Sequence, residues 1–192
     1  MKTDDLIETL VEDRGSRALR PGLAAIYALV AGTLIAGIIF ILILTPRPDM
    51  VSAAGTYRFW FKCVFTLALA ASAFPLVLQV FRPEASPGRW LWLLALAPAM
   101  LLAAALAELL AMPSSTWLPR MIGILPIFCF LSICALSIGP LLAFLAALKF
   151  GAPSKPGLAG ALAGIVSGGI GSALFIVHCP NDSPLFLLIW YS

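Results

Sequence analysis

Long apolar stretches, separated by short polar segments, dominate the chain from residue 23 onward. A helix needs about 20 apolar residues to cross a bilayer core of about 30 Å. Stretches of that length cover residues 23–44, 59–80, 90–112, 121–148 and 157–177. Lipid cannot satisfy an open strand edge, and the alternation typical of a transmembrane barrel is absent. Each stretch is therefore predicted to be a transmembrane helix.

A sixth apolar segment begins at Pro184, reads PLFLLIWYS and reaches the end of the sequence after nine residues. A helix of this length cannot cross a membrane. The segment fits a re-entrant stub, an interfacial anchor, or the start of a truncated sixth helix. We expect truncation, because an apolar end without a polar stop is unusual. The predicted fold is an all-α polytopic transmembrane bundle with five complete spans and an incomplete sixth.

Residues 1–22 form a polar tail in front of the predicted membrane domain, residues 23–192. This tail holds five acidic residues, whereas the segment that precedes the apolar core of a signal peptide is short and basic. The first span is therefore expected to be a retained anchor.

Lysine and arginine are distributed unequally between the two ends of the predicted bundle. With the N-terminus in the cytoplasm, the inner cations are Lys2, Arg14, Arg17, Arg20, Arg82, Arg89, Lys149 and Lys155. The outer cations are Arg47, Arg58, Lys62 and Arg120. Cytoplasmic loops carry an excess of Lys and Arg, so eight against four predicts a cytoplasmic N-terminus. The turn at residues 178–183 then lies outside.

The beginning of the tail combines acidic side chains with an apolar stripe. Thr3 suits a helix N-cap, and acids in the first turn suit the helix dipole. Leu6, Ile7, Leu10 and Val11 then share one helical face. The candidate partner-binding residues are Asp4, Asp5, Leu6, Ile7, Glu8, Leu10 and Val11.

Two interpretations of this tail stay open on physical grounds. It is either a solvated segment that helps to set the topology, or a helix that docks into a groove of a basic cytoplasmic protein. Binding to the membrane surface is disfavoured, because anionic lipid repels the acids beside the stripe.

Composition excludes several classes of protein. Hydrophobic residues make up 61% of the chain and charged residues 11%, against about 45–50% and about 25% in soluble domains. A soluble enzyme is excluded first. The net charge of +3, without a basic cluster interleaved with aromatic residues, also disfavours direct nucleic-acid binding. We expect neither enzymatic activity nor a cofactor, since no CxxC pair or quinone-site pattern indicates a thiol oxidoreductase.

Few polar residues lie inside the predicted spans. Glu108 and Lys62 each lie near a span end, and we interpret both as snorkelling to the interface. The alternative function is a small transporter or channel subunit. Such a protein would need a polar pathway through the bundle, and the polar residues in the predicted spans are only Glu108 and scattered Ser and Thr. Gly160, Gly164 and Gly168 repeat at four-residue spacing, which predicts close helix packing.

The four cysteines, Cys63, Cys129, Cys134 and Cys179, show no disulfide or zinc framework. Cysteines in membrane helices are most often small apolar fillers. On the predicted topology, however, Cys63, Cys129 and Cys179 lie in the outer half of the bundle. The fourth and fifth spans are joined by a short connection and are expected to be neighbours. Cys129 and Cys179 are then able to approach each other.

The chain resembles the NrsF family of bacterial inner-membrane anti-sigma factors, which are negative regulators of extracytoplasmic-function (ECF) sigma factors. The resemblance rests on the start MKTDDLI, the six-span layout, and the late sequence HCPNDSPLF followed by Trp190 and Tyr191. It covers essentially the whole chain. It implies a regulator that sequesters its sigma factor at the membrane, with the short cytoplasmic N-terminus holding the partner.

In that family two cysteines are linked to the response to heavy-metal or oxidative stress. The resemblance carries these roles to Cys179, in the HCP turn, and to Cys129, in the fourth span. The implied signal is a soft metal ion held by both thiolates, with His178 as a candidate third ligand, or a disulfide between them. The chain departs from the family pattern by ending inside the expected sixth helix.

Overall fold

The computed structural model describes residues 20–81, 88–151 and 153–191. The predicted tail helix lies outside these residues, and so do the candidate partner-binding residues Asp4, Asp5, Leu6, Ile7, Glu8, Leu10 and Val11. The described part of the chain consists of helices and loops and contains no strand.

Five segments of the described chain are long and apolar enough to cross a membrane. They are α2 (Pro21–Ile43), α4 (Tyr57–Val80), Trp90–Ala111, Pro126–Phe150 and α8 (Pro156–Phe175). The third combines part of η1 (Gly88–Ala95) with α5 (Leu96–Ala111), and the fourth combines α7 (Pro126–Ala147) with η3 (Leu148–Phe150). The predicted all-α bundle of five spans is confirmed.

The start of the fourth span was predicted too early. The helix begins at Pro126, and the preceding apolar residues form η2 (Ser114–Thr116) and a separate helix, α6 (Trp117–Ile122). Gly123 and Leu125 have φ values of 62° and 48°, left-handed conformations that interrupt a right-handed helix. Hydropathy does not reveal this break, because the residues on both sides of it are apolar.

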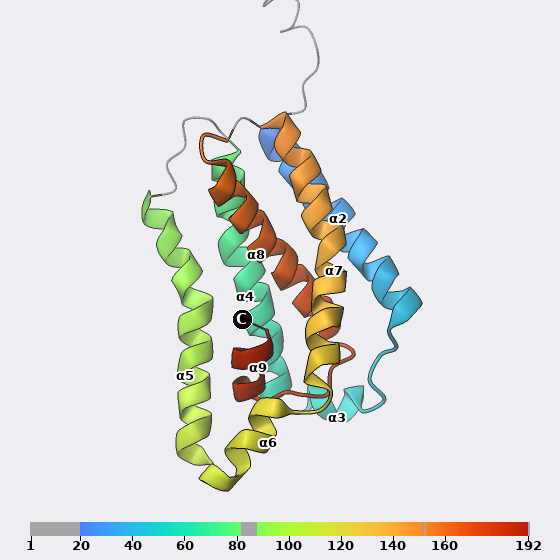
Figure 1. The fold of residues 1–192 in the computed structure, drawn as a ribbon, viewed down its shortest axis with the longest axis vertical. Coiled ribbons are helices and arrows are strands. Elements are labelled where there is room, and N and C mark those ends of the chain that lie inside the picture. The colour runs from blue at the N-terminus through green and yellow to red at the C-terminus, as the bar shows by residue number, and fades with distance from the viewer. Residues whose placement is uncertain (1–19, 82–87, 152, 192) are drawn as a thin grey trace, which may run out of the picture.

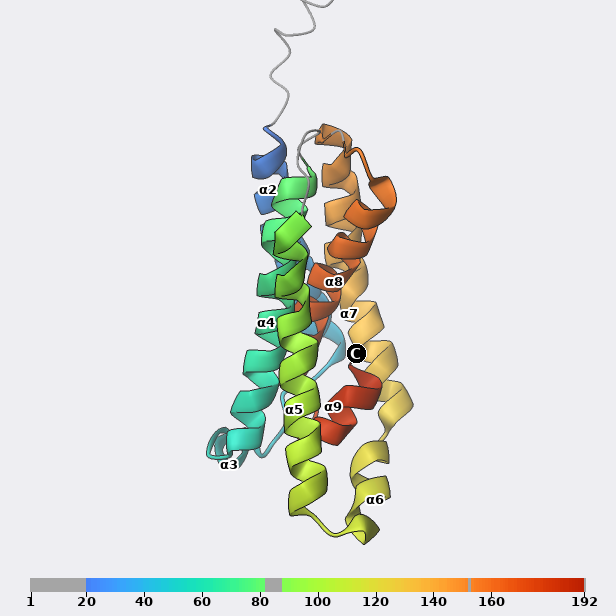
Figure 2. The ribbon, with the colours of Figure 1, turned by 90° about the vertical axis from the view of Figure 1, so that its left-hand side faces the viewer.

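The spans run roughly side by side between two ends of the bundle (Figure 1). At one end, called here the tail end, α2 begins after the N-terminal tail, α7 finishes and α8 begins. The opposite end, called the loop end, carries α3 (Met50–Ala54), α6 and the loop of residues 176–183. In the turned view of Figure 2, α5 lies on the face towards the viewer, and it packs beside α4.

The last apolar segment turns back into the bundle from the loop end. It forms α9 (Pro184–Trp190), which packs against α5 and α6. Leu185, Phe186 and Leu187 are almost completely buried there. The described segment is therefore re-entrant and not an interfacial anchor.

Glycines do bring helices together, but not the glycines of the predicted row. The Cβ positions of Gly160, Gly164 and Gly168 have open space around them. A methyl group on Gly169, by contrast, would lie 2.9 Å from the backbone nitrogen and Cβ of Ala70 on α4. Gly171 approaches Ser137 and Ile133 on α7 in the same way. The interpretation of the four-residue row as the close-packing face was therefore wrong.

A contact between α2 and α7 follows the same principle. A Cβ on Gly32 would lie 2.6 Å from the Cα of Pro140, and one on Gly139 would lie 2.6 Å from the side chain of Ile35. Close approach of small residues is a common way for helices to associate in lipid, where hydrophobic burial between helices gains little.

Two adjacent glycines of α8 give a matched test of this packing. Gly169→Ala should lower the unfolding free energy by about 1–2 kcal/mol, because the added methyl overpacks the contact with α4. Gly168→Ala should leave stability unchanged or raise it, because alanine has the better helix propensity and the site is open. Thermal unfolding of the purified protein in detergent compares the two variants. Equal effects of both substitutions would contradict the assignment.

Candidate functional site: a thiol pair held by a buried ionic network

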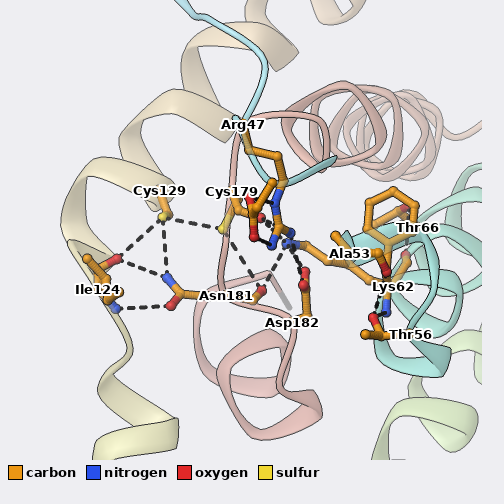
Figure 3. A network of polar contacts seen from close by, with 12 residues as sticks. Arg47, Ala53, Thr56, Lys62, Thr66, Ile124, Cys129, Cys179, Asn181 and Asp182 are labelled. Atoms are coloured by element: carbon orange, nitrogen blue, oxygen red, sulfur yellow. Dashed lines mark hydrogen bonds and ion pairs between the residues drawn. The ribbon is translucent and has the colours of Figure 1, made fainter. Parts of the chain in front are cut away.

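Two cysteines meet near the loop end of the bundle. Cys129 lies on the first turn of α7, and Cys179 lies in the loop after α8. Their sulfur atoms are 3.7 Å apart, both side chains are buried, and both thiols are free (Figure 3). The expected approach of these two thiols is therefore confirmed. Because α7 begins at Pro126, Cys129 lies nearer the loop end than the predicted span implied.

The other two cysteines do not join this pair. Cys63 on α4 is half-buried beside Phe59 and Ile176, in a separate apolar cluster. Cys134 is exposed on the surface of α7. Sequence position alone placed three thiols in this half of the bundle, but only the packing of α7 on α8 selects two of them.

The backbone after α2 holds the segment that carries Cys179. The amide of Arg47 donates to the carbonyl of Val177 at 2.9 Å. Nδ1 of His178 donates to the carbonyl of Thr45 at 2.6 Å. The Cys179 amide itself bonds back to Phe175 at 3.0 Å, which continues the end of α8 for one turn. The loops after α2 and α8 are thus joined next to the thiols.

His178, the candidate third ligand, has its contacts with the aromatic rings and backbone around it. Its ring lies beside Phe128 and Phe175, with centroid distances of 5.8 and 5.5 Å, and Nδ1 is used by Thr45. The described residues contain no group of three or more His, Cys, Asp or Glu side chains that could hold a metal ion. In this arrangement the two thiols lie together, and His178 as a third ligand stays a prediction.

Asn181 connects the Cys179 loop to the break before α7. Its side-chain amide donates to the carbonyl of Ile124 at 2.9 Å, and its Oδ1 accepts from the Ile124 amide at 3.1 Å. The same amide lies 4.0 Å from the sulfur of Cys129. These bonds stabilise the left-handed turn at Gly123 and Leu125, and they fix the two cysteine-bearing segments relative to each other.

Lys62 points into the protein and is fully buried. Its ammonium donates to the carbonyl oxygens of Cys179 at 3.1 Å and Asn181 at 2.9 Å, and to the carboxylate of Asp182 at 3.3 Å. Figure 3 shows this side chain reaching from α4 to the loop. The interpretation of Lys62 as a snorkelling residue was wrong, because the loop supplies all the partners that water would otherwise supply.

Arg47, in the segment after α2, contacts the same loop. It donates to the carbonyl of Cys179 at 3.3 Å and to Asp182 at 2.9 Å, and it makes two bonds of 2.7 Å to Asp49. Hydrogen bonds from the Arg47 guanidinium hold the pKa of Asp49 below its usual value. The carboxylate of Asp182 is therefore shared between two cations, Arg47 and Lys62.

Glu108 forms a second buried centre at the loop end. One of its oxygens pairs with Arg120 at 2.8 Å and with Arg58 at 3.3 Å. The other accepts from the Ser183 hydroxyl at 2.6 Å and from the Leu185 amide at 3.3 Å. One carboxylate thus joins α4, α5, α6 and the start of α9. The snorkelling interpretation of Glu108 was wrong for the same reason as that of Lys62.

The arrangement favours reaction at Cys179. A hydrogen bond from the Cys129 thiol lowers the pKa of Cys179, and the positive charge of Lys62 lowers it further against the opposing effect of burial. The thiolate is the reactive form of cysteine towards oxidants, disulfides and soft metal ions. The site therefore contains two adjacent free cysteines that can form either a disulfide or a two-sulfur metal complex.

Comparison with known proteins identifies the family. The family model described as "Negative regulator of sigma F", NrsF, matches residues 10–192. The chain belongs to the NrsF family. It is 34% identical over 200 residues to "Anti-sigma-F factor NrsF" of Caulobacter vibrioides (strain NA1000 / CB15N), an alignment that covers the whole chain and 91% of that relative.

A second relative leads to the same family. The chain is 33% identical over 203 residues to "Probable anti-sigma-F factor NrsF" of Azospira oryzae (strain ATCC BAA-33 / DSM 13638 / PS), with all of this chain and 90% of the relative covered. No solved structure matches the chain. The resemblance to the NrsF family is thereby confirmed. The family consists of negative regulators, which are not a class of enzymes.

The contacts of Glu108 predict that neutralising this carboxylate destabilises this NrsF-family chain much more than neutralising Asp49 does. Glu108→Gln should lower the unfolding free energy by about 2 kcal/mol, since hydrogen bonds to charged groups contribute about 1.5–3 kcal/mol and the arginine partners are partly exposed. Asp49→Asn should lower the unfolding free energy by less than about 1 kcal/mol. The side chain of Asp49 is half exposed, and Arg47 retains its ion pair with Asp182 in this variant. Thermal unfolding in detergent measures both, and a stability loss at Asp49 as large as that at Glu108 would contradict this account.

Proposed function

We propose that this chain is a membrane-bound anti-sigma factor that sequesters an ECF sigma factor at the bacterial inner membrane. Residues 1–13 hold the sigma factor, and modification of Cys129 and Cys179 releases it. Membership of the NrsF family supports the anti-sigma role. The observation that carries the release mechanism is the 3.7 Å separation of the two buried sulfur atoms.

The charges at the two ends support a cytoplasmic N-terminus. All ion pairs between described residues lie at the loop end and use Arg47, Arg58, Lys62 and Arg120. These cations are committed to structural contacts with carboxylates. The cations described at the tail end, Arg20, Lys149 and Lys155, are exposed. Exposed lysine and arginine favour the cytoplasmic side, so the tail faces the cytoplasm and the thiols face outward.

The tail suits a partner that presents a groove with basic and apolar surfaces. Its apolar stripe, Leu6, Ile7, Leu10 and Val11, offers burial of about 1.5–3 kcal/mol for each fully buried side chain. Asp4, Asp5 and Glu8 beside the stripe attract a basic surface during association. A sigma factor, which contacts DNA, has such surfaces.

The thiol pair supports two chemical signals. A two-electron oxidant would take two electrons and two protons from the thiols, which then form one S–S bond. A soft divalent cation would instead bind both thiolates and release their protons. Two sulfur ligands of one tetrahedral ion, at metal–sulfur distances of about 2.3 Å, lie about 3.8 Å apart, close to the observed separation.

Either event would alter the contact between α7 and the end of α8. Both helices run from the thiols to the tail end, where they lie near the start of α2 (Figure 1). A shift worth about 1.4 kcal/mol changes the affinity for a partner tenfold. The transporter alternative is weaker, because Glu108 is engaged by two arginines and α9 and does not line an open polar path.

Orientation is tested with cysteines introduced at the two ends of a variant that lacks the four native cysteines. A membrane-impermeant thiol reagent should label Val51→Cys at the loop end in intact spheroplasts, since Val51 is 91% exposed. It should label the exposed tail-end site Ser154→Cys only after lysis. The reverse pattern would show that the N-terminus faces outward.

Partner binding and release are tested by co-purification with an ECF sigma factor from the same organism. Leu6→Ser, Ile7→Ser and Leu10→Ser together should abolish binding and leave membrane insertion intact, because the apolar stripe is lost. Cys129→Ser with Cys179→Ser should retain binding, whereas oxidant or cadmium should no longer lower it. In the unaltered chain either reagent should weaken binding at least about tenfold, equivalent to about 1.4 kcal/mol.

Matched variants separate these effects from general damage. Leu19→Ser, an apolar change in the tail outside the stripe, should bind normally. Cys63→Ser with Cys134→Ser should release the sigma factor as the unaltered chain does. Normal release from the variant that lacks Cys129 and Cys179 would exclude the thiol mechanism, and normal binding by the tail variant would exclude the tail as the binding element.

A further inference from the structure

Two arginines at the loop end of the bundle share one carboxylate. Arg120 contacts Oε1 of Glu108 at 2.8 Å, and Arg58 contacts the same oxygen at 3.3 Å. Because they meet at one atom, the two guanidinium groups are neighbours. Both arginine side chains are partly exposed, whereas the carboxylate is buried. The arginine pair therefore carries one more positive charge than the carboxylate between its members.

The rest of the ionic network does not supply the missing negative charge. Arg47 and Lys62 are matched by two carboxylates, Asp49 and Asp182. One oxygen of Asp182 accepts from Arg47 and the other from Lys62, so both are occupied. Among the ion pairs of the described residues, the excess positive charge therefore lies at the arginine pair.

Each arginine of the pair also has N–H groups without an acceptor among the described residues. Arg120 donates to Glu108 from Nη1. Arg58 donates from Nε to the Tyr57 hydroxyl at 3.2 Å and contacts Glu108 through Nη2. A guanidinium has five N–H donors in a planar fork, which matches the oxygens of a carboxylate or a phosphate. The pair can therefore bind a further anion and retain Glu108.

Both arginines line a cavity of about 440 Å³ at the loop end. Small-molecule sites have volumes of about 300–1,000 Å³, so the cavity is large enough for a phosphate group with a small headgroup. Thr56 and Asp182 also contribute to the lining. The carboxylate of Asp182 opposes an anion, but its charge is already matched within the network.

Aromatic and apolar side chains indicate that the cavity lies at the level of the lipid headgroups. Tyr57 and Trp60, at the start of α4, are exposed, and these residue types are enriched at membrane–water interfaces. Leu118 and Ile122 of α6, on either side of Arg120 in the sequence, are exposed apolar side chains. A phospholipid with its phosphate at the arginines therefore has apolar surface nearby for its acyl chains.

We propose that this cavity binds a phosphate group through Arg58 and Arg120. An anionic phospholipid and free inorganic phosphate are the two sources of this chemistry, and the interfacial position favours the lipid. The bound phosphate supplies the missing negative charge and joins α4, which carries Arg58, to α6, which carries Arg120. The inference goes beyond the function proposed above and does not depend on it.

The experiment measures lipid binding to the full chain, purified in detergent, by native mass spectrometry. Dioleoylphosphatidylglycerol is the probe, and dioleoylglycerol, which has the same acyl chains and no phosphate, is the matched lipid. The first phosphatidylglycerol molecule should bind at least about tenfold more tightly than dioleoylglycerol, because hydrogen bonds to charged groups are strong. Inorganic phosphate serves as competitor. Displacement of the lipid by phosphate at equal concentration would keep the phosphate site and assign it to the soluble ion.

Substitution of the two arginines tests the assignment of the site. Arg58→Gln and Arg120→Gln should each weaken phosphatidylglycerol binding at least about tenfold, because each removes a positive charge and its donors from the cavity. Arg20→Gln is the matched control. It removes an exposed cation at the tail end and should leave binding unchanged.

A pair of variants at Thr56 tests the proposal even where an arginine variant does not fold. Thr56 lines the cavity and caps α4 by accepting from the Phe59 amide at 3.4 Å. Aspartate and asparagine are both good N-caps, so Thr56→Asp and Thr56→Asn should both preserve the helix. Thr56→Asp places a carboxylate beside the arginines and should weaken lipid binding at least about tenfold, whereas Thr56→Asn should bind normally.

Three results would each overturn the proposal. They are the absence of binding by both phosphatidylglycerol and inorganic phosphate, equally tight binding of dioleoylglycerol and phosphatidylglycerol, and equal binding by Thr56→Asp and Thr56→Asn. Each of these results leaves the proposed function in place, because sigma binding and release are measured through the tail and the thiols.

Discussion

Full compensation of two buried charges, Lys62 and Glu108, underlies the structure of the loop end. A charge removed from water is tolerated only when opposite charge and hydrogen bonds replace its hydration. Lys62 obtains these from the loop after α8, and Glu108 obtains them from α4, α6 and the start of α9. Segments that are far apart in sequence are therefore held together by the requirements of two side chains.

The thiol pair depends on these contacts. Cys129 is placed by α7, whereas Cys179 lies in a loop whose position is set by Lys62, Arg47 and Asn181. Close helix contacts at Gly169 and Gly171 bring α8 against α4 and α7, and thereby bring the loop within reach of all three residues. The 3.7 Å separation of the sulfurs is thus a product of helix packing and of the ionic network together.

The separation of the two ends suits a regulator that has its signal and its partner on opposite sides of a membrane. The thiol pair and the ion pairs of the described chain gather at the loop end. The helix α2 begins at the other end, near the last turns of α7 and the first turns of α8 (Figure 1). In the function proposed above, α7 and α8 would carry a change at the thiols to the tail end, because continuous helices are stiff connections.

The sequence by itself determined the fold class, the approximate spans and the family. Runs of about 20 apolar residues permit few structures other than helices in lipid, because each helix satisfies its own backbone. The short link between the fourth and fifth spans made the meeting of Cys129 and Cys179 predictable in outline. The prediction of a partner-binding helix in the tail likewise uses only the local pattern of acidic and apolar residues.

Only the tertiary structure decided the roles of Lys62, Glu108, Arg47 and Asn181. Their partners lie up to 135 residues away in the chain, and a charge near a span end carries no local signal that separates snorkelling from burial. Only the tertiary structure also decided which glycines make close helix contacts. The spacing of glycines in the sequence shows which of them share a helix face, but it does not show which helix packs against that face. The position of His178 also depends on the tertiary structure, because its Nδ1 bonds to the backbone of Thr45, 133 residues away in the chain.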